Sequence, residues 1–473
     1  MILLFVTALL MDVVRVCVPL LTCSRSKVSV LTKANVLVPT KRLEYLGNII
    51  DSETMTVTLP DRRIHKILQC CEELLHSDRA KIRNVARVVG LLVADVPAAE
   101  KGKLHYRRLE CAKIAVLRVA KGNFGKWMVV THEMRLDLLW WVSHIALQNR
   151  QIFWKGTELD LYTDASNLGW DGHLNQQKVN GRWSLSESAL HINAKELKAI
   201  SLVVRSFASL LKGRHVRVFC DNTTAVTYVN EMGGTRSSLC NDICRDLWEW
   251  CAVNDIWLTC SYVPGKVNLM ADAASWTFND RHEWKLNEEL FRALSEVCGV
   301  PSIDLFASRL NAQVTRFCSW KPDPDAEYFD AFSICWWQFE LIYLFRPFAL
   351  IARCLQKIRA ESAKGWMVLP LWPSQPWMGT LLTLLVKEPR LIPRGAHVLR
   401  HPSTEEEHPI LRHTRLMACL LSGNVCETGA FLRQVWTSSL PPGDLRLRGS
   451  TSHILTGGYS FVVAGTSIPF IPL

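Results

Sequence analysis

Two aspartates directly follow segments that the sequence predicts to be buried strands. In "ELDLYTDAS", residues 158–166, an apolar pattern ends at Asp164, and small residues come next. "HVRVFCDN", residues 215–222, ends in the same way at Asp221. A turn that favours Asp would give this pattern, and so would a metal site that needs a carboxylate on a rigid strand.

Two further acids lie on predicted helices. Glu196 falls in the first turns of "NAKELKAISLVVRSFASLL", for which Asn193 is the expected N-cap, and Asp272 lies beside small residues in "NLMADAASW". If the strand before Asp164 pairs in parallel with the strand before Asp221, both helices can close over the same sheet edge. Crowded carboxylates repel one another unless cations lie among them, and oxygen ligands suit Mg²⁺ or Mn²⁺. Two such ions about 4 Å apart would support phosphodiester hydrolysis.

Four segments carry a family resemblance. "LYTDAS", "HINAKELKAI", "VFCDNTTAV" and "YVPGKVNLMADAAS" resemble, in order, the four motif blocks of retroelement ribonuclease H domains. The resemblance implies an α/β fold over residues 155–280, with a mixed five-stranded sheet and flanking helices. It also implies hydrolysis of the RNA strand of an RNA–DNA hybrid at a two-ion site formed by Asp164, Glu196, Asp221 and Asp272.

Residues beside these acids have two open interpretations. Asn222 and Thr223 open a predicted helix, where they would contact the substrate backbone or a ribose 2′-hydroxyl, but Asn222 as a helix cap is equally well founded. His191 is interpreted as structural. Some family members have a histidine shortly before the last aspartate, whereas "YVPGKVNLMAD" has none, so proton transfer there would fall to solvent.

The upstream part resembles the end of a reverse transcriptase palm in retroelements of the DIRS type, through "LVPTKRLEYLGNIIDSETMTVTLP". This resemblance predicts a partial palm over residues 1–60 and a helical thumb or connection region over residues 61–150. The chain has no adjacent pair of aspartates of the polymerase type. We therefore expect the C-terminal piece of a polyprotein, which would need its missing N-terminal reverse transcriptase portion as a partner and would not polymerise DNA by itself.

The downstream part resembles the segment that follows ribonuclease H in the same polyproteins and that has been likened to adenine methyltransferases. That segment has a Phe-Pro-Pro-Phe stretch where this chain has "FRPF", so Arg346 departs from the pattern. Asp304 and Asp330 are candidate ligands there, although two structural acids are the favoured interpretation. We expect an accessory α/β domain over residues 300–400 and a loop-rich tail over 401–473.

The composition limits these hypotheses. The 473 residues are 49% hydrophobic, with a net charge of +11, which suits a folded protein with a nucleic-acid partner. The 16 cysteines lack zinc-type spacing and suggest free thiols in a reducing compartment, cytoplasmic or nuclear. The apolar start, residues 1–23, is interpreted as a core helix and not as a signal peptide or membrane span. A nucleic-acid-binding remnant without catalysis and a DNA adenine methyltransferase remain alternatives to the nuclease.

Overall fold

The computed structural model describes most of the chain between residues 40 and 473. The described residues are 40–152, 156–265, 283–345, 348–395, 397–403, 406, 408–412, 414–438, 459–463 and 466–473. The predictions for the apolar start, for Asp272 and for Arg346 lie outside them. Within the described part, no helix has both the length and the apolar character needed to cross a membrane, and the cysteines are free thiols, most of them buried.

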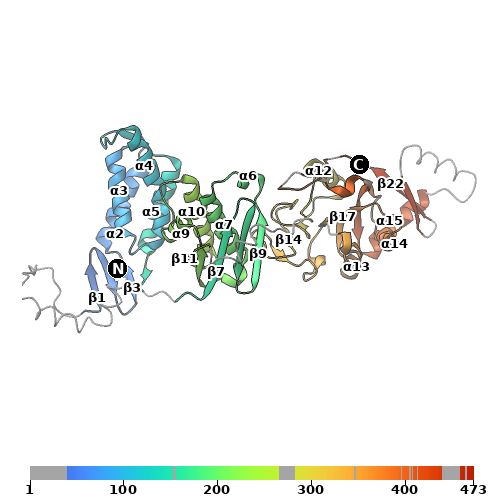
Figure 1. The fold of residues 1–473 in the computed structure, drawn as a ribbon, viewed down its shortest axis with the longest axis horizontal. Helices are drawn as coiled ribbons and strands as arrows, with labels where there is room; N and C mark the ends of the chain where they lie inside the picture. Colours follow the sequence, from blue (N-terminus) through green and yellow to red (C-terminus); the bar gives the residue numbers. More distant parts are fainter. Residues whose placement is uncertain are drawn as a thin grey trace, which may run out of the picture. The chain divides into compact units, whose positions relative to one another are not determined.

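The chain divides into two compact units, one of Met1–Glu158 with Val226–Thr259 and one of Leu159–Ala225 with Cys260–Leu473. The first unit begins with a small antiparallel sheet and continues as helices (Figure 1). Its sheet contains β1 (Arg42–Tyr45), β2 (Asn48–Asp51), β3 (Thr56–Thr58) and β6 (Arg150–Gln151). Its helices are α2 (Asp61–Leu75), α3 (Ile82–Asp95), α4 (Arg107–Val119) and α5 (His132–His144). An antiparallel pair of short strands, β4 (Arg79–Lys81) and β5 (Trp127–Val129), accompanies them.

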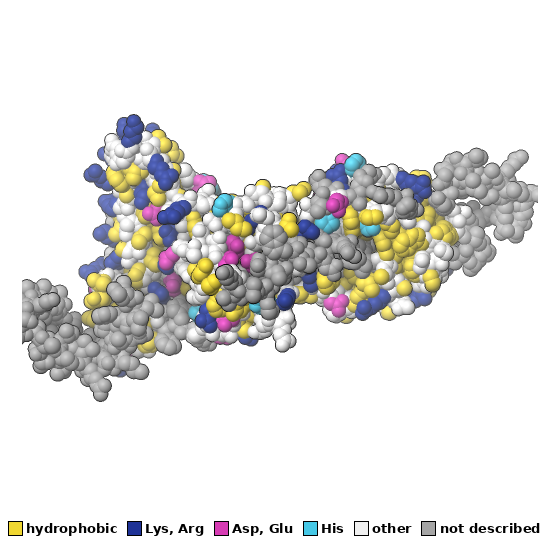
Figure 2. Space-filling view, viewed as in Figure 1, with side chains coloured by type: hydrophobic (Ala, Val, Ile, Leu, Met, Phe, Trp, Pro, Cys, Tyr) yellow, Lys and Arg dark blue, Asp and Glu magenta, His cyan; other side chains and the backbone are white. Residues whose placement is uncertain are grey.

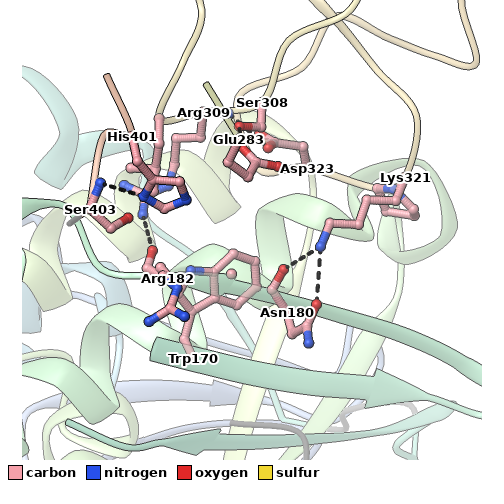
Figure 3. Close-up of a pocket in the computed structure, with 13 residues that line it drawn as sticks. Trp170, Asn180, Arg182, Glu283, Ser308, Arg309, Lys321, Asp323, His401 and Ser403 are labelled. Atoms are coloured by element: carbon pink, nitrogen blue, oxygen red, sulfur yellow. Dashed lines mark hydrogen bonds between the residues drawn. The ribbon is translucent and has the colours of Figure 1, made fainter. Parts of the chain in front are cut away.

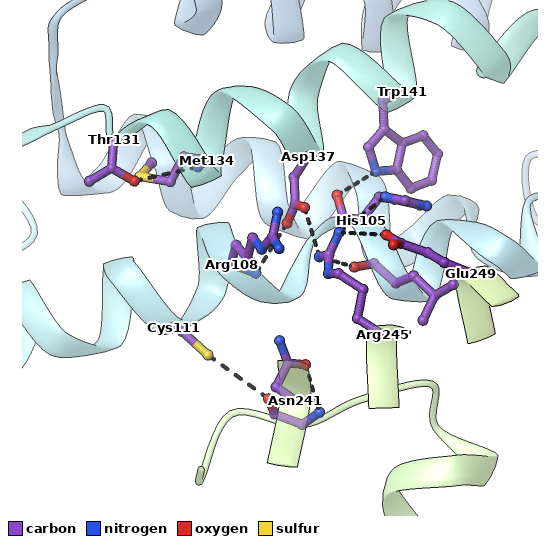
Figure 4. A network of polar contacts seen from close by, with 12 residues as sticks. His105, Arg108, Cys111, Thr131, Met134, Asp137, Trp141, Asn241, Arg245 and Glu249 are labelled. Carbon is purple, nitrogen blue, oxygen red and sulfur yellow. Dashed lines mark hydrogen bonds and ion pairs between the residues drawn. The ribbon is translucent and has the colours of Figure 1, made fainter. Parts of the chain in front are cut away.

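Helix α10 (Ser238–Val253) packs with these helices inside the first unit through one buried ion pair. Arg245, which is 7% exposed in its side chain, lies 2.8 Å from the Asp137 carboxylate of α5. The Arg245 guanidinium also donates to the Leu104 carbonyl, and Asp137 accepts from the backbone amide of Arg108 at 3.1 Å (Figure 4). Burial outweighs the guanidinium and raises the pKa of Asp137 to about 6.

A mixed five-stranded sheet follows, in the order β11-β10-β7-β8-β9. Its strands are β7 (Leu159–Ala165), β8 (Gly169–Leu174), β9 (Gln177–Arg182), β10 (His215–Cys220) and β11 (Trp257–Tyr262). The first three form an antiparallel meander, and β10 runs parallel to β7. Helices α6 (Leu185–Ser188), α7 (Ile192–Ser206), α8 (Ala208–Leu211) and α9 (Thr223–Asn230) complete the order expected from the sequence, except for the terminal helix around Asp272.

Helix α7 covers one face of this sheet. The chain approaches closely at Gly172 of β8, where a Cβ atom would lie 2.4 Å from a methyl group of Val203. Any larger residue at Gly172 would therefore push α7 off the sheet. Because side chains alternate along a strand, Asp171 beside Gly172 and Asp164 beside Thr163 face away from that packed layer.

The downstream part forms a second, seven-stranded sheet in the order β13-β16-β17-β20-β18-β22-β21. Its strands are β13 (Ile303–Asp304), β16 (Ile342–Phe345), β17 (Lys364–Pro370), β18 (Arg390–Leu391), β20 (Leu416–Ser422), β21 (Tyr459–Val463) and β22 (Thr466–Pro472). Short pairs join β12 (Lys285–Leu286) to β19 (Leu399–Arg400) and β14 (Cys318–Ser319) to β15 (Tyr328–Phe329). Its helices are α12 (Glu288–Cys298), α13 (Ile351–Glu361), α14 (Trp377–Thr383) and α15 (Val425–Ser438).

The expectation of a loop-rich tail after residue 400 is wrong for the described residues. Strand β20 pairs with β17 along its whole length, and α15, β21 and β22 follow it. The run "LMACLLS" has no polar alternation because β20 is buried on both faces, with Met417 and Leu421 in one core and Leu416 and Leu420 in another. The many Pro, Gly and Ser residues of the tail had favoured a prediction of loops over a prediction of this strand.

We predict that replacing Arg245 with Met destabilises the protein strongly. The change leaves the Asp137 carboxylate buried without its cation, so the free energy of unfolding should fall by about 3 kcal/mol or more. Arg217→Met is the matched control, because Arg217 pairs with Asp160 at a half-exposed position and should cost no more than about 1 kcal/mol. Urea unfolding of the full chain measures both, and equal losses would contradict the importance of the buried pair.

Candidate active site

Parallel pairing of β7 and β10 brings two of the predicted acids to one sheet edge. Phe219 of β10 lies opposite Tyr162 of β7. Asp221 and Asp164 each follow two residues later, so both carboxylates leave the sheet at the same level. The strand neighbours expected from the sequence are therefore present, and Asp164 is buried.

Helix α7 brings Glu196 to the same edge. The N-cap of α7 is His191, whose Nδ1 atom accepts from the backbone amide of Asn193 at 3.2 Å. The prediction that Asn193 caps this helix is therefore wrong, because His191 has the extended backbone of a cap and its ring satisfies the exposed amide. The cap starts the helix at Ile192, which places Glu196 in the second turn, 4% exposed.

The side chains of Glu196 and Asp221 converge. One ligand atom from each of Glu196, Cys220 and Asp221 lies within 4.8 Å of the others. The Cys220 thiol donates to Glu196 Oε2 at 3.7 Å. The loop after β11 also reaches this point, because a Cβ atom at Gly265 would lie 2.9 Å from Asp221 Oδ2. Asp164 belongs to the same electrostatic cluster through its effect on Glu196.

The electrostatics of Glu196 are those of a crowded acid. Burial, and after it the charges of Asp164 and Asp221, raise its pKa to about 9, while the hydrogen bond from Cys220 acts in the opposite direction. In the absence of a cation this side chain is therefore protonated at neutral pH. The charges of Asp164 and Asp221 therefore act on Glu196 from the same sheet edge.

A fifth acid, Asp171 of β8, was not recognised in the sequence. It lies directly opposite Asp164 in the antiparallel register and is 1% exposed. Burial and the charge of Asp164 raise its pKa to about 7. The segment "GWDGHL" predicted only a strand, because nothing in the sequence by itself says which residue faces Asp164. The register of β7 against β8 was the information needed.

Asn222 has the capping contact that the sequence left open. Its Oδ1 atom accepts from the backbone amide of Ala225 in the first turn of α9, at 3.0 Å. Its Nδ2 atom donates to Asn193 Oδ1 at 3.0 Å, which joins the end of β10 to the start of α7. Asn222 thereby holds Asp221 and Glu196 in position relative to each other. Thr223 is exposed beside it.

The donor set of this site fits a hard divalent cation. Carboxylate oxygens are the ligands that Mg²⁺ and Mn²⁺ prefer. Glu196 and Asp221 offer theirs within the 4.8 Å group, while Asp164 lies outside that group and acts on Glu196 through its charge. Cys220 is the third member of the group, and burial and Glu196 raise the pKa of its thiol far above the ordinary value.

A separate pocket in the second unit lies beside β8 and β9, lined by Trp170 and Arg182 together with downstream residues (Figure 3). Lys321 Nζ donates to the carbonyl and the Oδ1 atom of Asn180, at 2.9 and 3.0 Å. Arg309 forms two hydrogen bonds with Glu187, at 2.9 and 3.0 Å. These contacts fix residues 308–323 to the sheet, and the described acids Asp164, Glu196 and Asp221 do not line the pocket.

The downstream acids are engaged in backbone contacts. Asp304, at the end of β13, accepts from the amides of Phe306 and Gln313, at 3.3 and 3.2 Å. Asp330 is exposed, and it accepts from the amide of Phe332 at 3.0 Å. Both contacts suit the favoured interpretation of structural acids.

We predict that, without divalent cations, stability falls as pH rises from about 5 to 9. Between its ordinary pKa of 4.5 and its folded value of about 9, Glu196 binds more protons folded than unfolded, so raising the pH favours unfolding. Glu196→Gln should flatten this dependence and raise the melting temperature at pH 8. Thermal unfolding in EDTA measures the effect.

Glu187→Gln is the matched control of opposite sign. The Arg309 guanidinium and the amide and hydroxyl of Ser184 hold the pKa of Glu187 below its ordinary value despite burial. Its stabilisation is present above pH 4.5 and is lost as the pH falls, so Glu187→Gln should lower the melting temperature at pH 8. A parent protein whose melting temperature rises steadily to pH 9 in EDTA would contradict the assignment.

The comparisons with known proteins agree with this geometry for one part of the chain. Residues 155–241 match the family model described as the RNase H-like domain found in reverse transcriptase. No curated protein matches the chain. Among solved structures, the foamy viral protease-reverse transcriptase is similar at 14% identity and a TM-score of 0.20, in its complex with RNA/DNA hybrid, with 47% of this chain and 29% of that chain covered.

The structure of the foamy viral protease-reverse transcriptase in complex with double-stranded DNA is similar at 16% identity and a TM-score of 0.20, with 47% of this chain and 45% of that chain covered. The chain thus spans less than half the length of these structures. The assignment to the DIRS type stays a prediction. The family match and the five-stranded sheet confirm the expected fold class: residues 155–241 form an RNase H-like domain of the kind found in reverse transcriptases.

Proposed function

We propose that this chain hydrolyses the RNA strand of RNA–DNA hybrids, as part of a retroelement reverse transcriptase and ribonuclease H polyprotein. The observation that carries the proposal is the convergence of Glu196 and Asp221 beside Asp164 at one sheet edge, inside an RNase H-like domain. Buried acids that raise one another's pKa are common where a protein needs unusual protonation or a bound cation. The DIRS origin belongs to this proposal and rests on the sequence resemblance.

The residues that would hold two Mg²⁺ or Mn²⁺ ions are Asp164, Glu196 and Asp221, with Asp272 as the fourth member by resemblance. When bound, such ions activate a water molecule and stabilise the leaving oxygen of a phosphodiester. The protein's own part is to hold its carboxylates rigidly on β7, α7 and β10 and to release the proton of Glu196. Asn222 keeps α7 and the end of β10 together, and Thr223 is exposed where a sugar–phosphate backbone would pass.

A basic surface in the first unit supports a nucleic-acid substrate. Figure 2 shows Lys and Arg side chains gathered over the part of this unit that holds α3 and α4. Trp127 of β5 is 55% exposed there, with the Lys81 ammonium 5.9 Å from its ring. Cations that replace the counterions of phosphates, together with an exposed aromatic ring, suit a polyanion. Exposed cations near the β4–β5 strand pair include Arg79, Lys81, Arg83, Lys121 and Lys126.

We expect the parent chain to cut the RNA strand of a labelled RNA–DNA hybrid in Mg²⁺ or Mn²⁺. Asp221→Asn should lower the cutting rate by about a hundredfold or more, because loss of a ligand costs at least as much as loss of a group that orients one. Asp160→Asn is the control, since it removes the same charge from β7 at the half-exposed pair with Arg217 and should leave cutting unchanged.

The alternatives give different results in the same experiment. If the folded parent cuts nothing and binds the hybrid as tightly as Asp221→Asn does, the chain is a nucleic-acid-binding protein and not a nuclease. Equal cutting by the parent and by Asp221→Asn would place the chemistry elsewhere. No contact in the described residues favours the adenine methyltransferase, because Asp304 and Asp330 hold backbone amides.

A further inference from the structure

The acidic site continues across the sheet to a carboxylate that the proposed nuclease does not use. Asp171 lies opposite Asp164 in the β7–β8 register, and directly opposed residues of an antiparallel pair have Cβ atoms roughly 5 Å apart on the same face. Tyr162, two residues before Asp164, shows which face this is, because its ring stacks on His173 of β8 with centroids 4.6 Å apart. Asp164 and Asp171 therefore project side by side from the face that α7 leaves uncovered.

The environment of Asp171 does not compensate its charge. The side chain is 1% exposed, and neither carboxylate oxygen has a hydrogen-bond partner of normal geometry among the described residues, although the nearby backbone amide of Gly172 acts to lower its pKa. Lys178 and Lys321 lie close enough to act on it electrostatically, but neither forms an ion pair with it among the described residues. A buried acid without hydrogen bonds costs stability unless a ligand satisfies it.

The position of Asp171 indicates what that ligand is. Two carboxylates about 5 Å apart at Cβ can share one cation between their oxygens, and the second is then an additional oxygen ligand of a hard ion. A structural salt bridge would instead show an ammonium or guanidinium at the Asp171 oxygens, as Arg245 shows at Asp137.

We propose that Asp171 is an additional carboxylate ligand of the divalent cation bound at Asp164, so that the site has a fifth acid on β8. This inference rests on the proposed function, because it assumes a cation at Asp164. The ligand is Mg²⁺ or Mn²⁺, and Asp171 would extend the site from the β7–β10 edge toward β9. Extra negative charge would tighten cation binding and make the cation-free protein less stable.

Titration of the full chain with MnCl₂ by calorimetry, together with melting in EDTA and in MnCl₂, tests this. Asp171→Asn should weaken Mn²⁺ binding by about tenfold or more. In EDTA it should melt at a higher temperature than the parent, because it removes a buried, uncompensated charge. Asp160→Asn is the matched control from the same face of the sheet, and it should change neither Mn²⁺ affinity nor the gain in melting temperature on adding Mn²⁺.

The reference variant Asp221→Asn distinguishes a failure of the fifth ligand from a failure of the proposed metal site. If Asp221→Asn loses Mn²⁺ affinity and Asp171→Asn keeps the parent's affinity, the fifth ligand is wrong and the proposed nuclease site stands. If neither variant changes Mn²⁺ binding, the proposed metal site fails together with the inference. A lower melting temperature of Asp171→Asn in EDTA would identify a structural acid and also overturn the proposal.

Discussion

Mutual repulsion among buried carboxylates is the constraint on which the described site depends. Glu196 and Asp171 are each nearly inaccessible to solvent, and in both cases burial and the charge of Asp164 raise the pKa. Electrostatic repulsion favours separation of these carboxylates, and the fold of the chain opposes it. The site exists only because elements with independent reasons to fold hold these groups together: a parallel strand pair, an antiparallel meander and one capped helix.

The contacts around the acids explain how that repulsion is contained. His191 fixes where α7 begins, and the bond from Asn222 to Asn193 ties that beginning to the end of β10. The Cys220 thiol occupies one oxygen of Glu196 from the strand itself. None of these groups carries a formal positive charge in this arrangement, so they position the carboxylates without neutralising them. Rigid supports of this kind keep a site in shape in the absence of its ligand.

The sequence predicted those features of the site that depend on local pattern. Asp164 and Asp221 were found because each follows a buried strand, and Glu196 because it opens an amphipathic helix. Asp171 could not be found in this way, since its role depends on which residue of β7 it opposes, and register is a property of the pair. Likewise, β20 was missed because a strand buried on both faces lacks alternation, and the cap of α7 was assigned to Asn193 because histidine is a less common cap.

Other buried acids that the structure describes have different partners from the acids of this site. Asp137 is buried against Arg245, and the partly buried Glu187 pairs with Arg309. Asp323 is also buried, and it accepts from the backbone amides of Arg309 and Asp325. The fold thus supplies buried carboxylates with cations or amides at several places. At the end of β7 it supplies Glu196 with a thiol and Asp171 with no well-formed hydrogen bond from the described residues. This contrast supports the proposal that a cation binds at this sheet edge.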